Sequence, residues 1–231
     1  MSDITLTEAD FAALRALDTP TVCNALEITS PERRAMGFTT TPLVCPRPHL
    51  PPIVGFARTA TLRSMKPAAP DVVNRVAYYE YVAAGAGPTI TCIQDIDDHP
   101  GFGAFWGEVN TNIHKAIGCL GVITTGSIRD LPDCAEGFQL LADRVGPSHA
   151  HVHIVDFGKP VHIHGMDVQS GDLIHADQHG AVVIPIEVAR EVPKAAKQIQ
   201  NREAIVLAAC KAPGANIDTV KAALAKSAEY H

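Results

Sequence analysis

The chain has 231 residues, of which 46% are hydrophobic and 19% are charged, and its formal net charge at pH 7 is −6. This composition is typical of an ordered globular protein, and the length favours a single domain. The acidic balance argues against non-specific nucleic-acid binding, and no apolar run approaches the roughly 18 residues of a membrane-spanning helix. The N-terminal segment carries acidic residues and no apolar core, so it does not resemble a signal peptide, and we expect a cytoplasmic protein.

Two short helices are predicted near the N-terminus. The first begins close to residue 8, because Thr7 and Asp10 are spaced as in a capping box. Thr19 is the predicted N-cap of the second helix, and Pro20 occupies its first helical position, where a missing N–H is tolerated.

The next segment alternates between extended and helical patterns. Five prolines within residues 40–52 predict an extended loop. Residues 53–62 form a predicted strand, residues 69–84 a helix that ends at the following glycines, and residues 89–96 a second strand rich in β-branched side chains.

An acidic group follows the strand predicted at 89–96. It consists of Asp95, Asp97, Asp98 and His99. These side chains are either metal ligands or the caps of a solvated turn, and aspartates at a strand end usually belong to turns. We favour the turn, and Asp95 is the best placed of the group to reach a site.

A glycine-rich loop, a helix and a short strand then follow in residues 101–124. Val109, Ile113 and Ile117 recur at four-residue spacing, which predicts that they share one helix face. Gly118 is the expected C-cap, and residues 120–124 form a predicted buried strand.

The start of this helix and the end of this strand together predict a binding site. The first helical turn, Gly107, Glu108, Val109 and Asn110, would present unpaired N–H groups to an anion such as a carboxylate. Arg129 follows the strand and offers a bidentate partner for a carboxylate, and Asp130 beside it can hold a hydrated Mg²⁺ ion. If the strands before the two motifs are parallel neighbours, both motifs face one crevice. The competing interpretation is that Asp130 caps a helical turn that begins at Leu131.

Histidines alternate in two downstream segments, at His149, His151 and His153 and again at His162 and His164. Alternation on a strand would place each set on one face. A three-histidine zinc site is one interpretation, but ligands from a single strand face would splay apart. We favour a solvated or intersubunit face.

The C-terminal part begins with short strands in residues 165–185, with turns at Gly171 and Gly180. Residues 186–210 are predicted to be helical with a pause near Pro193, and residues 216–228 form a final peripheral amphipathic helix.

The central motifs resemble those of a known family. AFWGEV at 104–109, NIHKA at 112–116 and RDL at 129–131, with glycines between them, are similar to the class II pyruvate aldolases of the hydroxymethyl-oxoglutarate type. That family also contains the regulator of ribonuclease activity A, and some members carry an old label as menaquinone methyltransferases. Further similar segments are LDTPT at 17–21, NAL at 24–26, GDLIHAD at 171–177, Gly180 and residues 181–185.

The resemblance implies a fold and an assembly. We expect an α/β fold, a single layered domain of the swivelling β/β/α, phosphohistidine-domain-like kind over residues 1–231, with peripheral helices from about residue 187. Members assemble as trimers or hexamers with the active site between subunits. A neighbouring subunit would supply an acidic residue, for which Glu203 is a weak candidate.

The implied activity is that of a divalent-metal-dependent lyase acting on a 2-oxo acid through a pyruvate enolate. Its reactions would be retro-aldol cleavage of substrates like 4-hydroxy-4-methyl-2-oxoglutarate, decarboxylation of oxaloacetate, or both. Asp130 would hold Mg²⁺, Mn²⁺ or another divalent cation, Arg129 would support the enolate, and the amides of residues 107–110 would bind the substrate carboxylate. The base would be a metal-bound water, since no histidine is required by the family pattern.

Two departures from the family pattern affect this expectation. Thr125-Gly126 stands where many members have Asp-Gly, and Asn24 stands where many have Asp. If either acid positions water, decarboxylation or a different substrate is favoured over the aldol step.

Two other functions are alternatives. The first is a non-enzymatic protein-binding regulator of ribonuclease activity, which would not need Arg129, Asp130 and the anion-binding turn together. The second is a dehydrogenase, but Trp106 stands where a G-x-G-x-x-G motif beginning at Gly101 needs glycine. The pattern favours the lyase.

Overall fold

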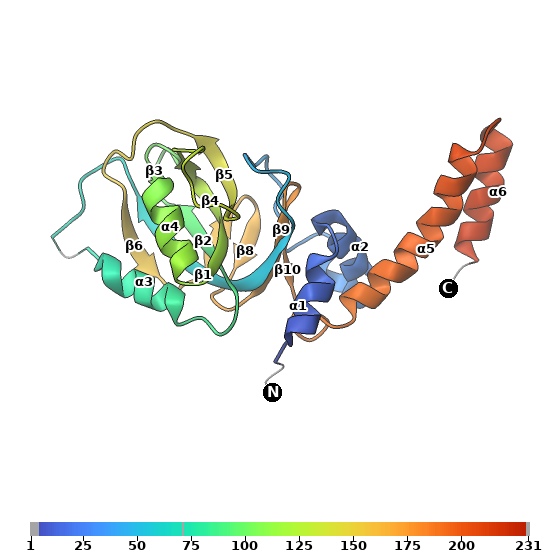
Figure 1. The fold of residues 1–231 in the computed structure, drawn as a ribbon, viewed down its shortest axis with the longest axis horizontal. Helices are drawn as coiled ribbons and strands as arrows, with labels where there is room; N and C mark the ends of the chain where they lie inside the picture. The colour runs from blue at the N-terminus through green and yellow to red at the C-terminus, as the bar shows by residue number, and fades with distance from the viewer. Residues whose placement is uncertain (1–4, 71, 230–231) are drawn as a thin grey trace.

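The computed structural model describes residues 5–70 and 72–229, which form an α/β fold built on a mixed sheet (Figure 1). Within these residues an eight-stranded sheet has the order β10-β9-β1-β2-β4-β3, with β5 paired to β4 and β6 paired to β1. Its strands are β1 (Ile53–Arg63), β2 (Thr89–Asp95), β3 (Ala104–Trp106), β4 (Cys119–Ile128), β5 (Gln139–Val145), β6 (His153–Phe157), β9 (Leu173–Asp177) and β10 (Gly180–Ile184). A separate hairpin pairs β7 (Val161–Ile163) with β8 (Met166–Val168). The α/β class expected from the sequence is confirmed.

Helices lie at both ends of this sheet. They are α1 (Glu8–Arg15), α2 (Thr19–Thr29), the 3₁₀ turn η1 (Pro31–Arg33), α3 (Arg75–Ala83), α4 (Glu108–Ala116), α5 (Val192–Lys211) and α6 (Ile217–Ala228). Figure 1 shows α3 and α4 at one end, α1 and α2 at the other, and α5 and α6 projecting away from the sheet as a helical hairpin. No helix in the described residues combines the length and apolar character needed to cross a bilayer.

The buried side chains form three clusters that join these elements. One cluster contains Tyr78, Trp106 and Phe138 and packs α3 against β1, β2, β4 and β5. A second joins α1, α2 and the first turns of α5 to β9 and β10, and a third fills the space between the sheet and the β7–β8 hairpin. Burial on this scale gives the α4 end of the sheet a rigid base, because protein interiors are close-packed.

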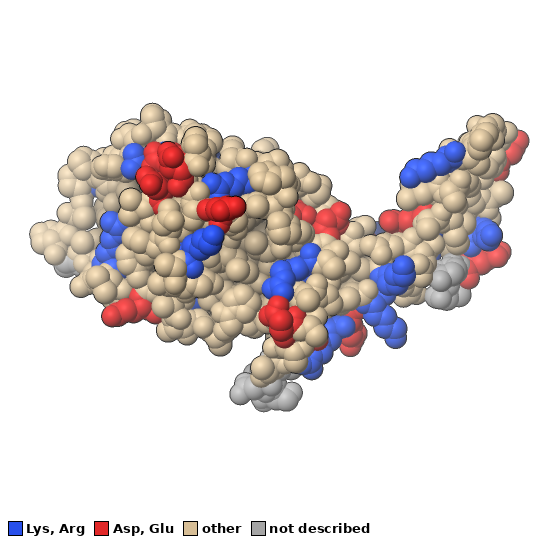
Figure 2. All heavy atoms as spheres, viewed as in Figure 1, with Lys and Arg blue, Asp and Glu red and all other residues tan. Residues whose placement is uncertain are grey.

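Charged side chains are distributed over the surface. On the face shown in Figure 2, acidic and basic residues are interspersed, and they continue along the α5–α6 hairpin. The cysteines are all free, and Cys92, Cys119 and Cys134 are buried, whereas Cys210 is exposed.

The N-terminal half of the chain largely follows the predicted elements. The capping box of Thr7 and Asp10 is present, but the N-cap of α2 is Asp18, whose carboxylate accepts the N–H of Thr21 at 2.8 Å. The prediction of Thr19 as N-cap was therefore wrong by one residue. The helix predicted over 69–84 begins only at Arg75, because the Asn74 side chain caps it by accepting the N–H of Val76. Residue 71 of that predicted helix lies outside the described residues, as do residues 1–4 of the acidic N-terminal segment.

Helix α4 buries a different face from the one predicted. Its buried residues are the polar Asn110, Thr111 and His114, whereas the side chain of Val109 is 64% exposed. The spacing of apolar residues predicted the wrong buried face, because the buried polar side chains all have hydrogen-bond partners. One such partner is the Gly107 carbonyl, which accepts from Thr111 Oγ1 at 2.8 Å.

Two other boundaries differ from prediction. Residues 104–106, assigned to the glycine-rich loop, form strand β3 beside β4. Helix α5 begins at Val192 with Pro193 in its first turn, so the proline marks the start of the helix and not a pause within it.

Candidate functional site

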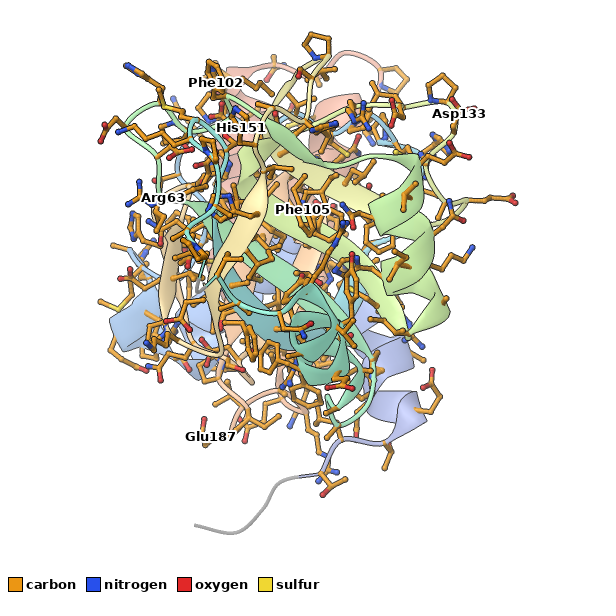
Figure 3. All side chains as sticks on the ribbon, turned by 90° about the vertical axis from the view of Figure 1, so that its left-hand side faces the viewer. Arg63, Phe102, Phe105, Asp133, His151 and Glu187 are labelled. Atoms are coloured by element: carbon orange, nitrogen blue, oxygen red, sulfur yellow. The ribbon has the colours of Figure 1, made fainter. Side chains whose placement is uncertain are left out.

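A cavity of about 550 Å³ lies where β3 and β4 end, at the end of the molecule farthest from α5 and α6. Figure 3 looks onto this end and labels Phe105 and His151, two residues that line the cavity. The lining residues come from four segments and are Pro67, Ala68, Arg75, Ala104, Phe105, Gly107, Val109, Asn110, Arg129, Asp130, His149, Ala150, His151, Val152 and His153.

The pairing of β3 with β4 explains why the two predicted motifs meet. The strands are parallel, Trp106 is in register with Ile128, and the Arg129 N–H donates to the Trp106 carbonyl at 2.8 Å. The next residues along both strands are Gly107 and Arg129-Asp130, so they emerge side by side at the carboxyl edge of the sheet. The strands that were expected to be parallel neighbours, β2 and β4, are paired in parallel as well, and both motifs border one cavity at this edge.

Gly107 is the N-cap of α4 and leaves room for the acidic side chain. A Cβ added at Gly107 would lie 2.6 Å from Oδ2 of Asp130 and 3.2 Å from Cγ of Arg129. Real Cβ atoms do not approach other atoms as closely as 2.6 Å. Glycine at this position therefore allows the Asp130 carboxylate to lie against the first turn of α4.

Asp130 has an unusual backbone, with φ of 52°, in the left-handed region that few residues other than glycine, asparagine and aspartate adopt. Its carbonyl oxygen accepts the N–H groups of Asp133 and Cys134 at 2.9 and 3.0 Å. The turn that follows Asp130 is thus started by its backbone carbonyl and not by its side chain as a cap. Its carboxylate faces the cavity instead, 3.5 Å from Nε of Arg129, and both side chains are 35% exposed.

The first turn of α4 forms the neighbouring wall. The first helical hydrogen bond runs from the Thr111 N–H to the Gly107 carbonyl at 3.0 Å. The N–H groups of Glu108, Val109 and Asn110 precede it and have no acceptor within the helix, as at any helix start. Gly107, Val109 and Asn110 line the cavity, while the side chain of Glu108 is exposed outside it.

Arg75 is a lining residue that the sequence did not single out. It lies at the start of α3, where its Nη2 donates to Oδ1 of Asn110 at 2.8 Å and its Nε donates to the hydroxyl of Tyr79 at 2.8 Å. Tyr79 also donates to Asn110 Oδ1 at 2.8 Å. A lone arginine at a helix start is usually solvated, so no sequence pattern distinguished it. It adds a second guanidinium to the cavity that contains Arg129.

Buried His114 stabilises the first turn of α4 through its hydrogen bonds. Its Nδ1 lies 2.7 Å from the carbonyl of Asn110 and its Nε2 lies 2.9 Å from the hydroxyl of Tyr78. Burial lowers the pKa of His114 to about 4, so the ring is neutral at physiological pH.

The segment containing His149, His151 and His153 also lines the cavity. Only His153 belongs to a strand, because residues 149–152 turn across the sheet edge and Ala150 has φ of 47°. The expected single strand face was therefore wrong, although all three residues line one cavity. The glycine-rich loop approaches this segment closely, since an added Cβ at Gly103 would lie 2.6 Å from the His149 carbonyl oxygen.

The second pair of histidines does not share a face either. His162 is exposed on β7 and its Nδ1 lies 2.7 Å from Oδ1 of Asp167. His164 follows the strand in a turn with φ of 50°, where it is buried and contacts Thr41 Oγ1 and the Thr124 carbonyl. The strand ends at Ile163, so alternation no longer applies.

The acidic group after β2 holds loops together. The carboxylate of Asp95 accepts the N–H groups of Gly101 and Asp97 at 2.8 and 3.0 Å, and burial raises its pKa. The carboxylate of Asp97 accepts the N–H groups of Ser64 and Met65 at 2.5 and 2.9 Å. Neither residue lines the cavity, so the turn interpretation accounts for both.

The cavity suits a hydrated divalent cation better than a fully protein-coordinated one. In the described part of the chain, no group of three or more His, Cys, Asp or Glu side chains is placed to hold a metal ion. Asp130 offers a carboxylate to the cavity, in the space that Gly107 leaves open. One carboxylate with waters and substrate oxygens is a normal ligand set for Mg²⁺.

The chain is similar to known proteins in family and in fold. The family model RraA-like, described as Aldolase/RraA, matches residues 19–183, which include Gly107, Arg129 and Asp130. No curated protein matches the chain.

Solved structures share the fold. An uncharacterized protein from Pseudomonas syringae pv. tomato str. DC3000 superimposes with a TM-score of 0.72 at 20% identity, over 96% of this chain and 97% of that one. Streptomyces coelicolor RraAS2, described as an unusual member of the RNase ES inhibitor RraA family, gives 0.68 at 23% identity over 86% and 95%. The RNA-processing inhibitor RraA from Thermus thermophilis gives 0.50 at 18% identity over 69% and 90%.

Proposed function

The chain belongs to the RraA-like family of aldolase and RraA proteins, and on that premise we propose that it is a divalent-metal-dependent lyase that cleaves 2-oxo acids through a pyruvate enolate. The reaction is retro-aldol cleavage of 4-hydroxy-4-methyl-2-oxoglutarate-like substrates, decarboxylation of oxaloacetate, or both. These reactions share the enolate, because each leaves the electron pair of the broken carbon–carbon bond on the pyruvyl fragment.

One observation carries this proposal. Gly107, Arg129 and Asp130 meet at one wall of the cavity, with the Asp130 carboxylate in the space that a side chain at 107 would fill. A helix start and a guanidinium both attract carboxylates, whereas a carboxylate beside them has no use in binding another anion. Their combination suits a substrate anion bound together with a cation.

The residues of the chain have separate tasks in this reaction. The N–H groups of residues 107–110 orient the substrate carboxylate, and Arg129 stabilises the charge that develops on the enolate oxygen. Asp130 would hold Mg²⁺ or Mn²⁺, which supplies Lewis-acid stabilisation of that charge when bound. Arg75 adds positive charge to the cavity and keeps Asn110 in place through its 2.8 Å hydrogen bond.

We also propose that the cavity is completed by a second subunit of a trimer or hexamer. Exposed apolar side chains border it or lie nearby, including Val76 and Val109, which are 60% and 64% exposed. Glu203 lies on α5 and lines a groove with Asn24 and Glu27, far from the cavity of its own chain. It would therefore reach only the cavity of a neighbour.

The two departures from the family pattern lie outside the cavity lining. The Thr125 hydroxyl accepts the N–H of Asp95 at 2.8 Å, and Asn24 lines the groove beside α5. Neither position offers an acid to the cavity of this chain. These two departures therefore do not separate the aldol reaction from decarboxylation.

A non-enzymatic regulator is the alternative, because two relatives are described as RraA inhibitors of RNA processing or of RNase ES. A protein-binding surface has no need of a carboxylate and two guanidinium groups within one cavity. The assembled cavity therefore favours the lyase.

The test is pyruvate release from oxaloacetate and from 4-hydroxy-4-methyl-2-oxoglutarate, with Mg²⁺ and with excess chelator. Chelator-sensitive turnover of either substrate is the expected result and ranks the two reactions. Absence of turnover on both with metal present, together with recovery of a ribonuclease or helicase in a pulldown, would support the regulator instead.

A further inference from the structure

The turn that follows Asp130 is held by an arginine from a distant part of the chain. Arg47 is half-buried in the proline-rich loop that precedes β1. Its guanidinium donates four hydrogen bonds to backbone carbonyls, from Nη1 to Ala135 at 2.5 Å and Phe138 at 3.3 Å, and from Nη2 to Cys134 at 2.7 Å and Leu131 at 3.3 Å. All four acceptors lie within residues 131–138, so one side chain binds most of the connection between β4 and β5.

The loop that carries Arg47 is itself attached to the sheet beside this connection. Val44 exchanges two backbone hydrogen bonds with Ala142 of β5, at 2.7 and 3.1 Å. Pro48 disfavours a helical backbone at the residue before it, which is Arg47. The planar guanidinium is therefore presented to its four carbonyls by a backbone with little freedom, so few conformations are lost when the hydrogen bonds form.

Cys134 connects Arg47 to the candidate site. Its carbonyl accepts from Arg47, as described above. Its N–H donates to the Asp130 carbonyl at 3.0 Å, and its Sγ donates to the Arg129 carbonyl at 3.4 Å. The next N–H along the turn donates to Thr111 Oγ1 of α4 at 2.9 Å. A single residue thus contacts Arg47 and the backbones of both residues that follow β4.

The backbone of Asp130 requires such support. A φ of 52° is in the left-handed region, which costs an aspartate free energy and persists only where the surrounding structure holds it. Three of the four residues whose carbonyls bind Arg47 are themselves buried, namely Cys134, Ala135 and Phe138. A buried carbonyl without a donor is costly, so without the guanidinium the turn would rearrange toward water and the Asp130 carboxylate would move with it.

We propose that Arg47 is a positioning residue for Asp130. By holding residues 131–138 it keeps the carboxylate in the space beside Gly107, where the proposed cation binds; the inference rests on the lyase function proposed above. Arg47 does not line the cavity, so it acts through the turn and not by contact with substrate or metal. Its own positive charge opposes the binding of a cation nearby, so a loss of cation affinity on its replacement reports a change of geometry and not of charge.

The test is Mn²⁺ binding to Arg47→Lys, measured by water proton relaxation. Lysine keeps the positive charge, but a single ammonium group cannot reproduce a fork that reaches four carbonyls. Mn²⁺ affinity should fall about tenfold, the lower end of the cost of losing a group that orients a metal ligand. Arg47→Met would leave all four carbonyls without this donor and destabilise the fold most, so the lysine variant is the primary one.

Amide hydrogen exchange examines the turn directly in the same folded variant. The N–H groups of Asp133 and Cys134 both donate to the Asp130 carbonyl, and they should exchange faster in Arg47→Lys than in the wild type. Unchanged exchange at these two amides would show that Arg47 does not hold the turn, and it would overturn the proposal.

Arg58→Lys is the matched control. Arg58 is also half-buried, and its Nη2 also donates to a backbone carbonyl, that of Tyr81, whose ring centroid lies 3.8 Å from the guanidinium carbon. It does not line the cavity, so its replacement should lower the melting temperature and keep the Mn²⁺ affinity of the wild type. Equal loss of affinity in both lysine variants would mean that Mn²⁺ binding merely follows overall stability, and the proposal would be wrong.

A double variant tests whether Arg47 acts through the carboxylate. In an Asp130→Asn background, Arg47→Lys should have no further effect on Mn²⁺ affinity, because the ligand that it positions is already lost. A further loss as large as in the wild-type background would contradict this route.

Mn²⁺ binding and pyruvate release together separate the two proposals. If Arg47→Lys has the Mn²⁺ affinity and the pyruvate release of the wild type, the role of Arg47 is overturned and the lyase stands. Absence of both in the wild type would contradict the lyase, and with it the inference that rests on it.

Discussion

Gly107 and Asp130 are so close that a Cβ added to the glycine would lie 2.6 Å from Oδ2 of the aspartate. They are 23 residues apart in sequence (130 − 107 = 23) and meet because β3 and β4 are parallel and in register at Trp106 and Ile128. The glycine is required by the neighbouring carboxylate and not by its own backbone, which is extended with φ of −165°. This relation leads to the first prediction.

Gly107→Ala should lower turnover by about 100-fold or more, because moving a catalytic group by an ångström costs on that order. Stability should change little, since alanine adopts the extended backbone of Gly107 without strain. Steady-state kinetics and thermal unfolding of the variant measure both effects. Gly118→Ala is the matched control: it has open space but φ of +88°, so it should lose about 1 kcal/mol of stability and keep its activity. Full activity in Gly107→Ala would contradict the placement of Asp130.

Asp130→Asn should weaken Mn²⁺ binding at least tenfold, because the amide lacks the charge that a hard cation prefers. Asparagine tolerates the left-handed backbone of residue 130, so the melting temperature should stay within a few degrees of wild type. Asp130→Ala should in addition lose about 1 kcal/mol, since alanine at φ of 52° is strained. Water proton relaxation reports the binding, and unchanged Mn²⁺ affinity in Asp130→Asn would exclude the carboxylate as a ligand.

Arg75→Gln should raise KM for oxaloacetate by about tenfold with a smaller effect on kcat. The variant removes one positive charge from the cavity and the hydrogen bond that Nη2 donates to Asn110. Arg63→Gln is the control, because Arg63 pairs with Asp97 at 3.4 Å and does not line the cavity. If both variants have the KM of wild type, Arg75 does not attract the substrate.

The protein should lose stability as the pH falls from about 6.5 toward 4. Burial lowers the pKa of His114 from 6.5 to about 4, so between these values the unfolded chain binds more protons than the folded one. Stability therefore decreases with falling pH, by an amount on the order of 3 kcal/mol for this residue. Urea unfolding at several pH values measures the slope, which should be shallower in His114→Gln. Burial also lowers the pKa of His175, so part of the slope should remain.

Elements with strong local patterns could be predicted from the sequence. The capping box of α1, the strand at Ile53–Arg63 and the start of α4 at Gly107 follow from cap chemistry, β-branched runs and glycine. The buried face of α4 could not be predicted from the sequence. Its polar residues His114 and Thr111 can be buried because they form hydrogen bonds with groups distant in sequence or in the helix backbone. Periodicity counts only apolar side chains.

Only one wall of the candidate site could be predicted from the sequence. Arg129 and Asp130 follow a strand and Gly107 starts a helix, so sheet topology was enough to bring them together. Arg75 and His153 reach the cavity through a loop and a turn whose paths depend on tertiary contacts, such as the hydrogen bond from the His151 N–H to the Ser64 carbonyl at 3.0 Å. No local pattern in the sequence encodes such contacts.

The most direct test of the lyase function is the rate of pyruvate formation from oxaloacetate, above the rate of metal ions alone. Wild type and Asp130→Asn are compared with Mg²⁺ and with excess EDTA. The account predicts Mg²⁺-dependent turnover by the wild type that falls at least 100-fold both with EDTA and in the folded variant. Turnover that survives EDTA and the loss of the Asp130 carboxylate would contradict it.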